Sequence, residues 1–195
     1  MLIRPGEAHI VWAQETVIGL FQKCREVFFS MPDDKSPYLK LIQGAAAGMI
    51  ATVPMTLFMR SAWKRLPAQE QYALPPREVT RNVIRPHRFF RLSPEKQTLL
   101  TLLLHFLFGA ATGSVYGMVE EKIPLRESVK GPLAGLAVWA GSYLGWIPAL
   151  GILPPATEHP WRRNAMMIVA HLIWGMVLGT LAGVTNSKSN YIKIQ

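Results

Sequence analysis

The chain has 195 residues; 50% of them are hydrophobic and only 17% are charged, whereas a typical soluble domain carries about 25% charged residues. This composition excludes a disordered chain or a fibrous repeat and argues against a water-soluble globule. The single cysteine, Cys24, excludes an intrachain disulfide framework and a cysteine-based zinc site. The net charge is +9. Because the basic residues flank apolar stretches, we expect them to contact anionic lipid headgroups and not nucleic acid.

Four long stretches of the chain contain no Asp, Glu, Lys or Arg. They are residues 41–59, 97–119, 131–157 and 164–187. A helix that crosses the hydrocarbon core of a bilayer, roughly 30 Å thick, needs about 20 largely apolar residues. The sequence therefore predicts an all-α, polytopic membrane protein with four transmembrane helices.

The N-terminal segment 1–38 differs from the rest because charged side chains interrupt its apolar residues. Apolar residues recur there at steps of three and four, with Glu15 and Lys23 among the charged residues between them. Such spacing is typical of an amphipathic helix, and this one is too charged to span a bilayer. We expect residues 7–30 to form a helix that lies on the membrane surface or on a partner.

The transmembrane domain is predicted to occupy residues 39–185, followed by a polar tail at 186–195. The predicted spans, in chain order, are 38–62, 93–120, 131–150 and 161–184. Pro54 lies inside the first span and is expected to kink it. Ser93 precedes the second span, where its side chain is suited to cap the first turn.

The two halves of the domain carry the same features in the same order, which indicates a duplication. Repeat one covers residues 39–120 and repeat two covers 129–185. Each contains a Gly-x-x-x-Gly motif, an interior proline, a Leu-Pro-Pro segment and then a histidine followed by three glycines at four-residue spacing. Two spans separate the copies, so both copies have the same orientation in the membrane. The sequence predicts two tandem hairpins related as a parallel repeat.

The repeated glycines predict close helix contacts, because association within lipid depends on backbones approaching each other. Glycines four residues apart lie on nearly the same face of a helix. We expect the two histidine-bearing helices to pack along these faces, against each other or against the other two helices. The predicted helix-packing residues are Gly44, Gly48, Gly109, Gly113, Gly117, Gly131, Gly135, Gly175, Gly179 and Gly183.

His105 and His171 each lie about two turns inside a predicted span, and an ionisable residue at that depth calls for a functional hypothesis. One interpretation is a neutral imidazole that hydrogen-bonds across helices. A second is a pair of axial haem ligands facing one another. A third is a site for proton- or solute-coupled transport. We expect no cofactor on the first and third interpretations, and haem on the second.

A series of arginines follows the first predicted span at steps of three or four residues. On a helix this spacing forms one basic face, and the apolar residues between them would rest on the membrane interface. Pro86 would interrupt any long helix in this segment. The predicted lipid-headgroup residues are Arg77, Arg81, Arg85, Arg88 and Arg91.

Motifs for catalysis are missing from the sequence. It contains no phosphate-binding loop, no dinucleotide-binding glycine motif and no His-Glu-x-x-His zinc motif. No nucleophile, base and oxyanion donor occur at a supporting spacing. The sequence therefore predicts a protein that is not an enzyme and has no metal site.

The Leu-Pro-Pro segments and the residues after the second of them form a specific pattern. It consists of Leu74-Pro75-Pro76-Arg77, Leu153-Pro154-Pro155, Pro160-Trp161, Asn164 and His171-Leu172-Ile173-Trp174. Over residues 41–180 the chain resembles the YagU-like proteins, a bacterial inner-membrane family of unknown biochemical function. The resemblance implies a multi-pass protein of the bacterial cytoplasmic membrane and transfers no catalytic residue.

These patterns favour an accessory or scaffolding membrane protein that acts by helix packing. Its expected partners are anionic lipids and either other membrane subunits or a second copy of itself. One alternative is a small-solute or proton-coupled transporter or channel. The other is a haem-binding redox subunit that uses His105 and His171. The Leu-Pro-Pro loops and their flanks hold slightly more basic residues than the rest of the loops and tails, which predicts that these loops are cytoplasmic.

Overall fold

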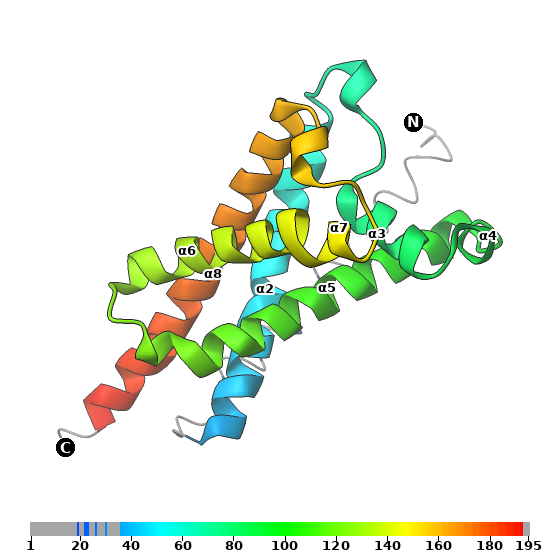
Figure 1. Ribbon diagram of the computed structural model, residues 1–195. Helices are drawn as coiled ribbons and strands as arrows, with labels where there is room; N and C mark the ends of the chain where they lie inside the picture. Colours follow the sequence, from blue (N-terminus) through cyan, green and yellow to red (C-terminus); the bar gives the residue numbers. More distant parts are fainter. Residues whose placement is uncertain (1–18, 20–21, 24–25, 27–29, 31–35, 193–195) are drawn as a thin grey trace, which may run out of the picture.

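A computed structural model describes residues 19, 22–23, 26, 30 and 36–192, and every regular element in this part of the chain is helical (Figure 1). The amphipathic helix predicted for residues 7–30 lies almost wholly outside the described residues. The helices are α2 (Pro37–Trp63), α3 (Pro75–Val83), α4 (Pro86–Phe89), α5 (Pro94–Val119), α6 (Glu127–Ala140), α7 (Ile147–Ala149) and α8 (Trp161–Ile192). Short 3₁₀ turns occupy Ala68–Glu70, Glu120–Lys122 and Ala156–Glu158.

Within the described residues, three helices are long and apolar enough to cross a membrane. They are α2, the helix Pro94–Lys122 that extends α5, and the Trp161–Gly183 part of α8. The three match the first, second and fourth predicted spans, so the prediction of a helical chain is confirmed for the described residues, and the length and composition of these helices are those of a membrane-embedded protein. Helix α8 continues beyond its apolar part into the predicted polar tail, where neither glycine nor proline interrupts it.

The third predicted span, residues 131–150, is not one regular helix. Helix α6 ends at Ala140, a wide π-helical segment covers Gly141–Trp146, and α7 adds one short turn. Gly145 has φ −110° and ψ −109°, which is not helical. Pro148 has no N–H for the carbonyl of Leu144 and its ring collides with that carbonyl, so regular hydrogen bonding fails just before the proline. Apolar composition alone therefore predicted a regular span where the chain breaks.

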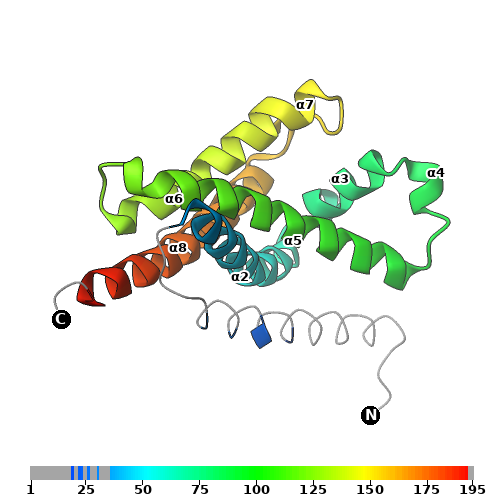
Figure 2. The same cartoon turned by 90° about the horizontal axis from the view of Figure 1, so that it is seen from below.

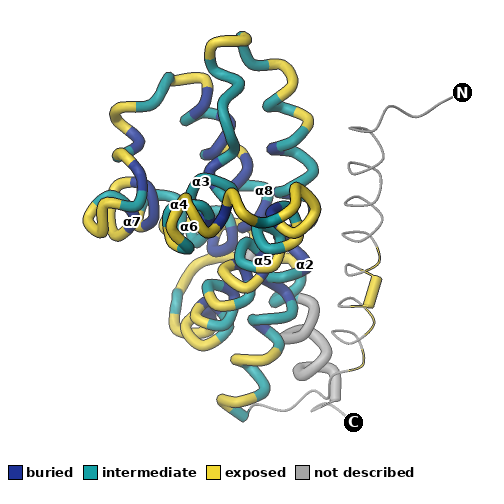
Figure 3. The backbone as a smooth tube through the Cα atoms, turned by 90° about the vertical axis from the view of Figure 1, so that its right-hand side faces the viewer, coloured by how far each residue is buried: buried dark blue, intermediate teal, exposed yellow. Residues whose placement is uncertain are grey.

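Two antiparallel helix pairs make up the fold (Figures 1 and 2). Helix α2 packs along α5, helix α6 packs along α8, and α2 also packs against α8 so that the pairs form one body. The main core lies at this junction, and buried residues gather where the helices cross (Figure 3). Among its fully or nearly fully buried members are Ala47, Ala51, Met59, Ala170, Trp174 and Leu178.

Helix α5 has an outer face of exposed apolar side chains. Four of these side chains, spaced at multiples of four residues, are Leu99, Leu103, Leu107 and Val115. A soluble protein rarely exposes an apolar face of this length, whereas lipid tails solvate one without cost. The arrangement fits a helix that faces the hydrocarbon core of a bilayer.

Candidate functional site: a cavity between the helix pairs

The contact between α2 and α5 is made by glycines. A Cβ atom added at Gly44 would lie 2.3 Å from the carbonyl oxygen of Gly113, and one added at Gly48 would lie 2.1 Å from that of Gly109. Gly117 meets the backbone of Lys40 in the same way. Any side chain larger than hydrogen would clash with the backbone of the facing helix at these positions, and no change of side-chain rotamer could remove that clash.

The contact between α6 and α8 is built the same way. A Cβ atom at Gly131 would lie 2.2 Å from the carbonyl oxygen of Gly175 and 3.0 Å from the Cα of Gly179, and one at Gly135 would lie 2.1 Å from the carbonyl oxygen of His171. Gly183 lies about two turns further along α8 than Gly175. Each histidine-bearing helix therefore packs against the first helix of its own pair, which was one of the two expected arrangements.

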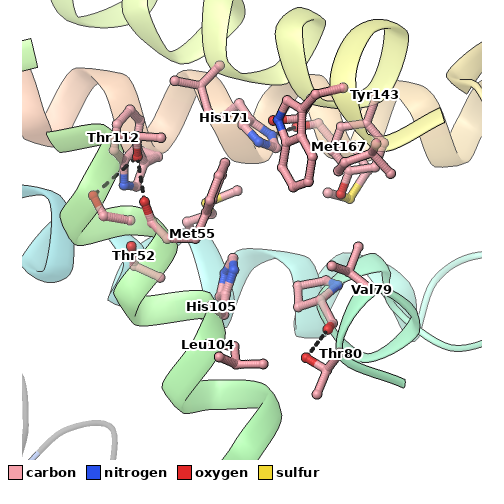
Figure 4. A pocket seen from close by; sticks show the side chains of 18 of the residues that line it. Thr52, Met55, Val79, Thr80, Leu104, His105, Thr112, Tyr143, Met167 and His171 are labelled. Atoms are coloured by element: carbon pink, nitrogen blue, oxygen red, sulfur yellow. Dashed lines mark hydrogen bonds between the residues drawn. The ribbon is translucent and has the colours of Figure 1, made fainter. Parts of the chain in front are cut away.

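A cavity of about 230 Å³ lies between the two pairs (Figure 4). Helices α2, α3, α5 and α8 and the π-helical segment all contribute to its wall. His105 of α5 and His171 of α8 line it from opposite sides, so the structure brings the two predicted histidines to one site. Aromatic rings from Phe108, Tyr143, Trp146 and Trp174 complete much of the lining.

His171 is only 5% exposed and is held in a defined orientation. Its Nδ1 lies 2.8 Å from the backbone carbonyl oxygen of Met167, one turn earlier in α8. Because a carbonyl only accepts, Nδ1 carries the hydrogen, and Nε2 of the neutral ring is an acceptor. The Tyr143 ring meets the imidazole edge to face, with the centroids 6.0 Å apart.

His105 has no comparable partner. Its Nε2 is buried, and no hydrogen-bond partner for this atom occurs among the residues the structure describes. The imidazole meets the ring of Phe106 edge to face at 6.3 Å between centroids. The expected hydrogen bond across helices is thus absent from the contacts described for either histidine: His171 bonds within its own helix, and Nε2 of His105 is buried without a described partner.

A polar cluster that sequence reasoning missed surrounds Arg163 at the start of α8. The side chain is 2% exposed, and its guanidinium donates to the carbonyl oxygens of Tyr72 (3.2 Å) and Ala73. It also pairs with the Glu78 carboxylate at 3.2 Å and lies over the Tyr72 ring, 3.7 Å from the centroid. In the sequence Arg163 resembles any basic residue that flanks a span, since its partners are distant in the chain.

Further contacts join the two Leu-Pro-Pro segments at this end of the molecule. The Tyr72 hydroxyl lies 2.9 Å from Nδ1 of His159, and the Asn82 side chain donates to the carbonyl of Ile152 at 2.7 Å. Burial raises the pKa of the Tyr72 phenol above its usual 10.0, and the positive charge of Arg163 opposes part of that rise. The phenol therefore stays neutral at physiological pH.

The five predicted headgroup arginines do not share one helix. Arg77 and Arg81 lie in α3, which ends at Val83, and Arg85 precedes α4 with a φ of +72°. Arg77 donates to the Gln97 side chain at 2.6 Å, and Arg81 donates to the neighbouring Asn82 at 3.1 Å. Arg85, Arg88 and Arg91 are exposed, together with Val83 and Phe90. The single basic face expected for this segment is therefore divided by the break between α3 and α4, at Arg85.

The turn between α5 and α6 is held by ion pairs. Glu120 and Lys130 are both buried, with 3.9 Å between the carboxylate and the ammonium group. Nearby, Lys40 at the start of α2 pairs with Glu121. These pairs connect the ends of the helices opposite the Leu-Pro-Pro segments.

The comparisons with known proteins give a family. The model of a family described as a protein of unknown function (DUF1440) matches residues 64–180. No curated protein and no solved structure matches the chain. The narrower resemblance to YagU-like proteins rests on the sequence pattern alone. Since the match covers more than half of the chain, the protein belongs to the DUF1440 family.

Proposed function

We propose that this is a multi-pass membrane protein that holds a small solute in the cavity between its two helix pairs and moves it across the bilayer. One observation carries the proposal: His105 and His171, from different pairs, line the same cavity. Ligand sites between membrane helices form preferentially where separate bundles meet, and rocking of one bundle against the other then exposes the site.

The broken third segment supports this function. Ser142, Tyr143, Trp146 and Ile147 of the π-helical segment and α7 all line the cavity. Irregular backbone is tolerated at membrane depth only where it is buried in protein or lines a cavity, and transporters commonly build their sites from such interrupted helices. We propose that residues 127–149 also cross the membrane, as the third of four segments in chain order. The α2–α5 and α6–α8 pairs are then the two duplicated hairpins.

The scaffolding interpretation has less support. It requires glycine faces that are free to receive a partner, whereas the described contacts of Gly44, Gly48, Gly131 and Gly135 are with the chain's own helices. The apolar outer face of α5 is equally suited to lipid. A solute site therefore explains more of the structure than a docking surface does.

Both Leu-Pro-Pro segments lie at one end of the molecule, where Arg163 and Asn82 hold them together. We place this end on the cytoplasmic side of a bacterial inner membrane, on the strength of the basic residues near it. Arg85, Arg88 and Arg91 would then meet anionic headgroups of the inner leaflet. A reporter that is active only in the cytoplasm, fused to the C-terminus, tests this orientation. The proposed orientation predicts an inactive reporter, and an active one would place the Leu-Pro-Pro end on the opposite side of the membrane.

Thiol accessibility tests the proposed function. In a Cys24→Ser background, Ser142→Cys places a thiol in the cavity, Val115→Cys places one on the lipid-facing side of α5, and Ser93→Cys places one at an exposed helix start. An uncharged, membrane-impermeant reagent, a maleimide on a neutral polyether chain, should modify the first and third but not the second. Labelling of Ser142→Cys from both faces supports transport. If Ser142→Cys resists the reagent from both faces while Ser93→Cys reacts, the cavity has no aqueous access and the proposal fails.

The haem alternative needs the same two imidazoles. A donated hydrogen bond from the second ring nitrogen to a carbonyl, as His171 makes to Met167 at 2.8 Å, is common among histidines that ligate metals. The absorption spectrum of the protein purified from membranes decides this alternative. A Soret band that disappears in both His105→Ala and His171→Ala supports haem, and a spectrum without the band excludes it.

A further inference from the structure

Several of the hydrogen-bond donors along the cavity wall already have acceptors within the protein. Thr52, Thr80 and Thr112 each donate to a backbone carbonyl one turn earlier in their own helices, at 2.8, 2.7 and 2.9 Å. Trp174 Nε1 donates to the carbonyl of Gly48 at 3.1 Å. Nδ1 of His171 is used in the same way. The hydroxyls of Ser142 and Tyr143 and the indole of Trp146 also line the cavity, and no hydrogen bond donated by them occurs among the described contacts, so the lining still offers a ligand donors there.

The ring nitrogen of His171 that faces away from Met167 is an acceptor for a ligand. Nε2 of His171 is an acceptor, since the bond to Met167 places the hydrogen on Nδ1. Nε2 of His105 is buried and without a partner among the described residues. Nε2 of His171 can therefore accept a hydrogen bond from a ligand, whereas Nε2 of His105 has almost no accessible surface and would need its ring to turn before a ligand could reach it.

The charge of the ligand is restricted as well. Within the described part of the chain, no Asp, Glu, Lys or Arg belongs to the cavity lining, and no group of three or more His, Cys, Asp or Glu gathers to hold a metal ion. An ion moved into such a site without a counter-charge loses hydration that nothing replaces. A neutral molecule does not meet this barrier.

The size and composition of the cavity restrict the rest of the ligand. Its volume of about 230 Å³ is below the range of roughly 300–1,000 Å³ that is common for drug-sized ligands. The faces and edges of Phe108, Tyr143, Trp146 and Trp174 border it, and aromatic rings favour stacked or edge-to-face contact with another ring. These features suit a single ring or a similarly compact apolar body.

Building on the proposed function, we infer that the cavity binds a small uncharged molecule with one hydroxyl group on a compact, ring-sized apolar body. The hydroxyl hydrogen is donated to Nε2 of His171. The apolar body lies among the aromatic rings that line the cavity.

Phenol and anisole form a matched pair of probes, because anisole keeps the ring and oxygen but lacks the hydrogen to donate. Both are titrated into the full chain in lipid nanodiscs by calorimetry, with empty nanodiscs to subtract partitioning into lipid. We expect the Kd of phenol to be about tenfold lower than that of anisole, because one neutral hydrogen bond contributes about 1.4 kcal/mol. Equal affinity of the two probes overturns the inference.

A variant identifies the acceptor. In His171→Asn the amide nitrogen replaces Nδ1 and still reaches the Met167 carbonyl, but no atom replaces Nε2. The preference for phenol should fall from about tenfold to less than twofold, whereas His87→Asn, an exposed histidine on α4, should retain it. If folded His171→Asn still prefers phenol about tenfold, Nε2 of His171 is not the acceptor. The phenol–anisole comparison on the unmodified chain does not depend on whether this variant folds.

Failure of the inference is separable from failure of the proposed function. If the thiol in Ser142→Cys reacts but phenol binds no more tightly than anisole, the cavity is accessible and only the ligand class is wrong. If the thiol does not react from either face, the solute site itself is rejected.

Discussion

The indole N–H of Trp174 on α8 donates a hydrogen bond of 3.1 Å to the backbone carbonyl of Gly48 on α2. Gly48 is also the position where α2 meets Gly109 of α5 so closely that no side chain fits. One residue without a side chain thus joins three helices, and through it the α2–α5 pair is connected to the α6–α8 pair. The cavity lies beside this junction, with Trp174 in its wall.

Trp174→Phe should reduce the free energy of unfolding in detergent by at least about 0.6 kcal/mol, the mean for hydrogen bonds between membrane helices. The loss stays small because the Thr52 hydroxyl also donates to the Gly48 carbonyl, at 2.8 Å, so that oxygen is not left unpaired. Denaturation by SDS, followed by circular dichroism, measures the change. Trp161→Phe is the control, because Trp161 is 71% exposed and should tolerate the change. Equal effects of the two substitutions would contradict the role of the Trp174 bond.

Adding one methyl group at a packing glycine should destabilise either pair. In Gly48→Ala and Gly135→Ala the new Cβ would lie 2.1 Å from a backbone oxygen of the facing helix, and overpacking of this kind costs about 1–3 kcal/mol. Gly141→Ala is the matched control, since nothing lies within 4 Å of its Cβ position, and removing a glycine should stabilise that segment slightly. Thermal unfolding in detergent compares the three variants. A Gly48→Ala protein as stable as Gly141→Ala is incompatible with the close contact.

The neighbouring residues Arg162 and Arg163 should respond very differently to glutamine. Arg163→Gln removes the donor to the Glu78 carboxylate and to the Ala73 carbonyl, and breaking a buried pair costs about 3–5 kcal/mol. Arg162 is 50% exposed and pairs with Glu70 at 3.2 Å, so Arg162→Gln should change stability by about 1 kcal/mol or less. Limited proteolysis should also cut the 64–74 segment faster in Arg163→Gln. Similar losses of stability in Arg162→Gln and Arg163→Gln would show that the buried contacts of Arg163 do not stabilise the protein more than the exposed pair of Arg162 does.

On the proposed placement of the Leu-Pro-Pro end at the membrane surface, the exposed arginines should determine the preference for anionic lipid. Replacing Arg88 and Arg91 by glutamine should weaken binding of phosphatidylglycerol by about 2 kcal/mol, or about 1 kcal/mol for each charge removed. Native mass spectrometry of the protein with phosphatidylglycerol and phosphatidylcholine measures the preference. Lys122→Gln/Arg126→Gln, which removes two exposed charges beside the α5–α6 turn, is the control. If the control variant loses as much preference for phosphatidylglycerol as the Arg88 and Arg91 variant does, these two arginines are not the headgroup contacts.

Local patterns predicted much of the fold. The apolar stretches located α2, α5 and α8, and Ser93 does cap the first turn of α5, accepting from the amide of Lys96 at 3.4 Å. The same kind of pattern failed at residues 131–150, where hydropathy is insensitive to the missing N–H of Pro148 and the non-helical Gly145. The candidate site was predicted only in part. His105 and His171 stood out as ionisable groups in apolar stretches, but Tyr143 and Ser142 did not, because nothing in their neighbourhood along the chain distinguishes them.

The amino-acid sequence by itself determined that this chain is helical and suited to lipid, and which helix faces permit close approach. Each of those properties depends on residues within a few turns of one another, and so it is visible in a short window. Only the tertiary structure decided that the two histidines share one cavity and that Arg163 is buried against Tyr72 and Glu78. These relationships join residues far apart in the chain, and they exist only once the helices have packed.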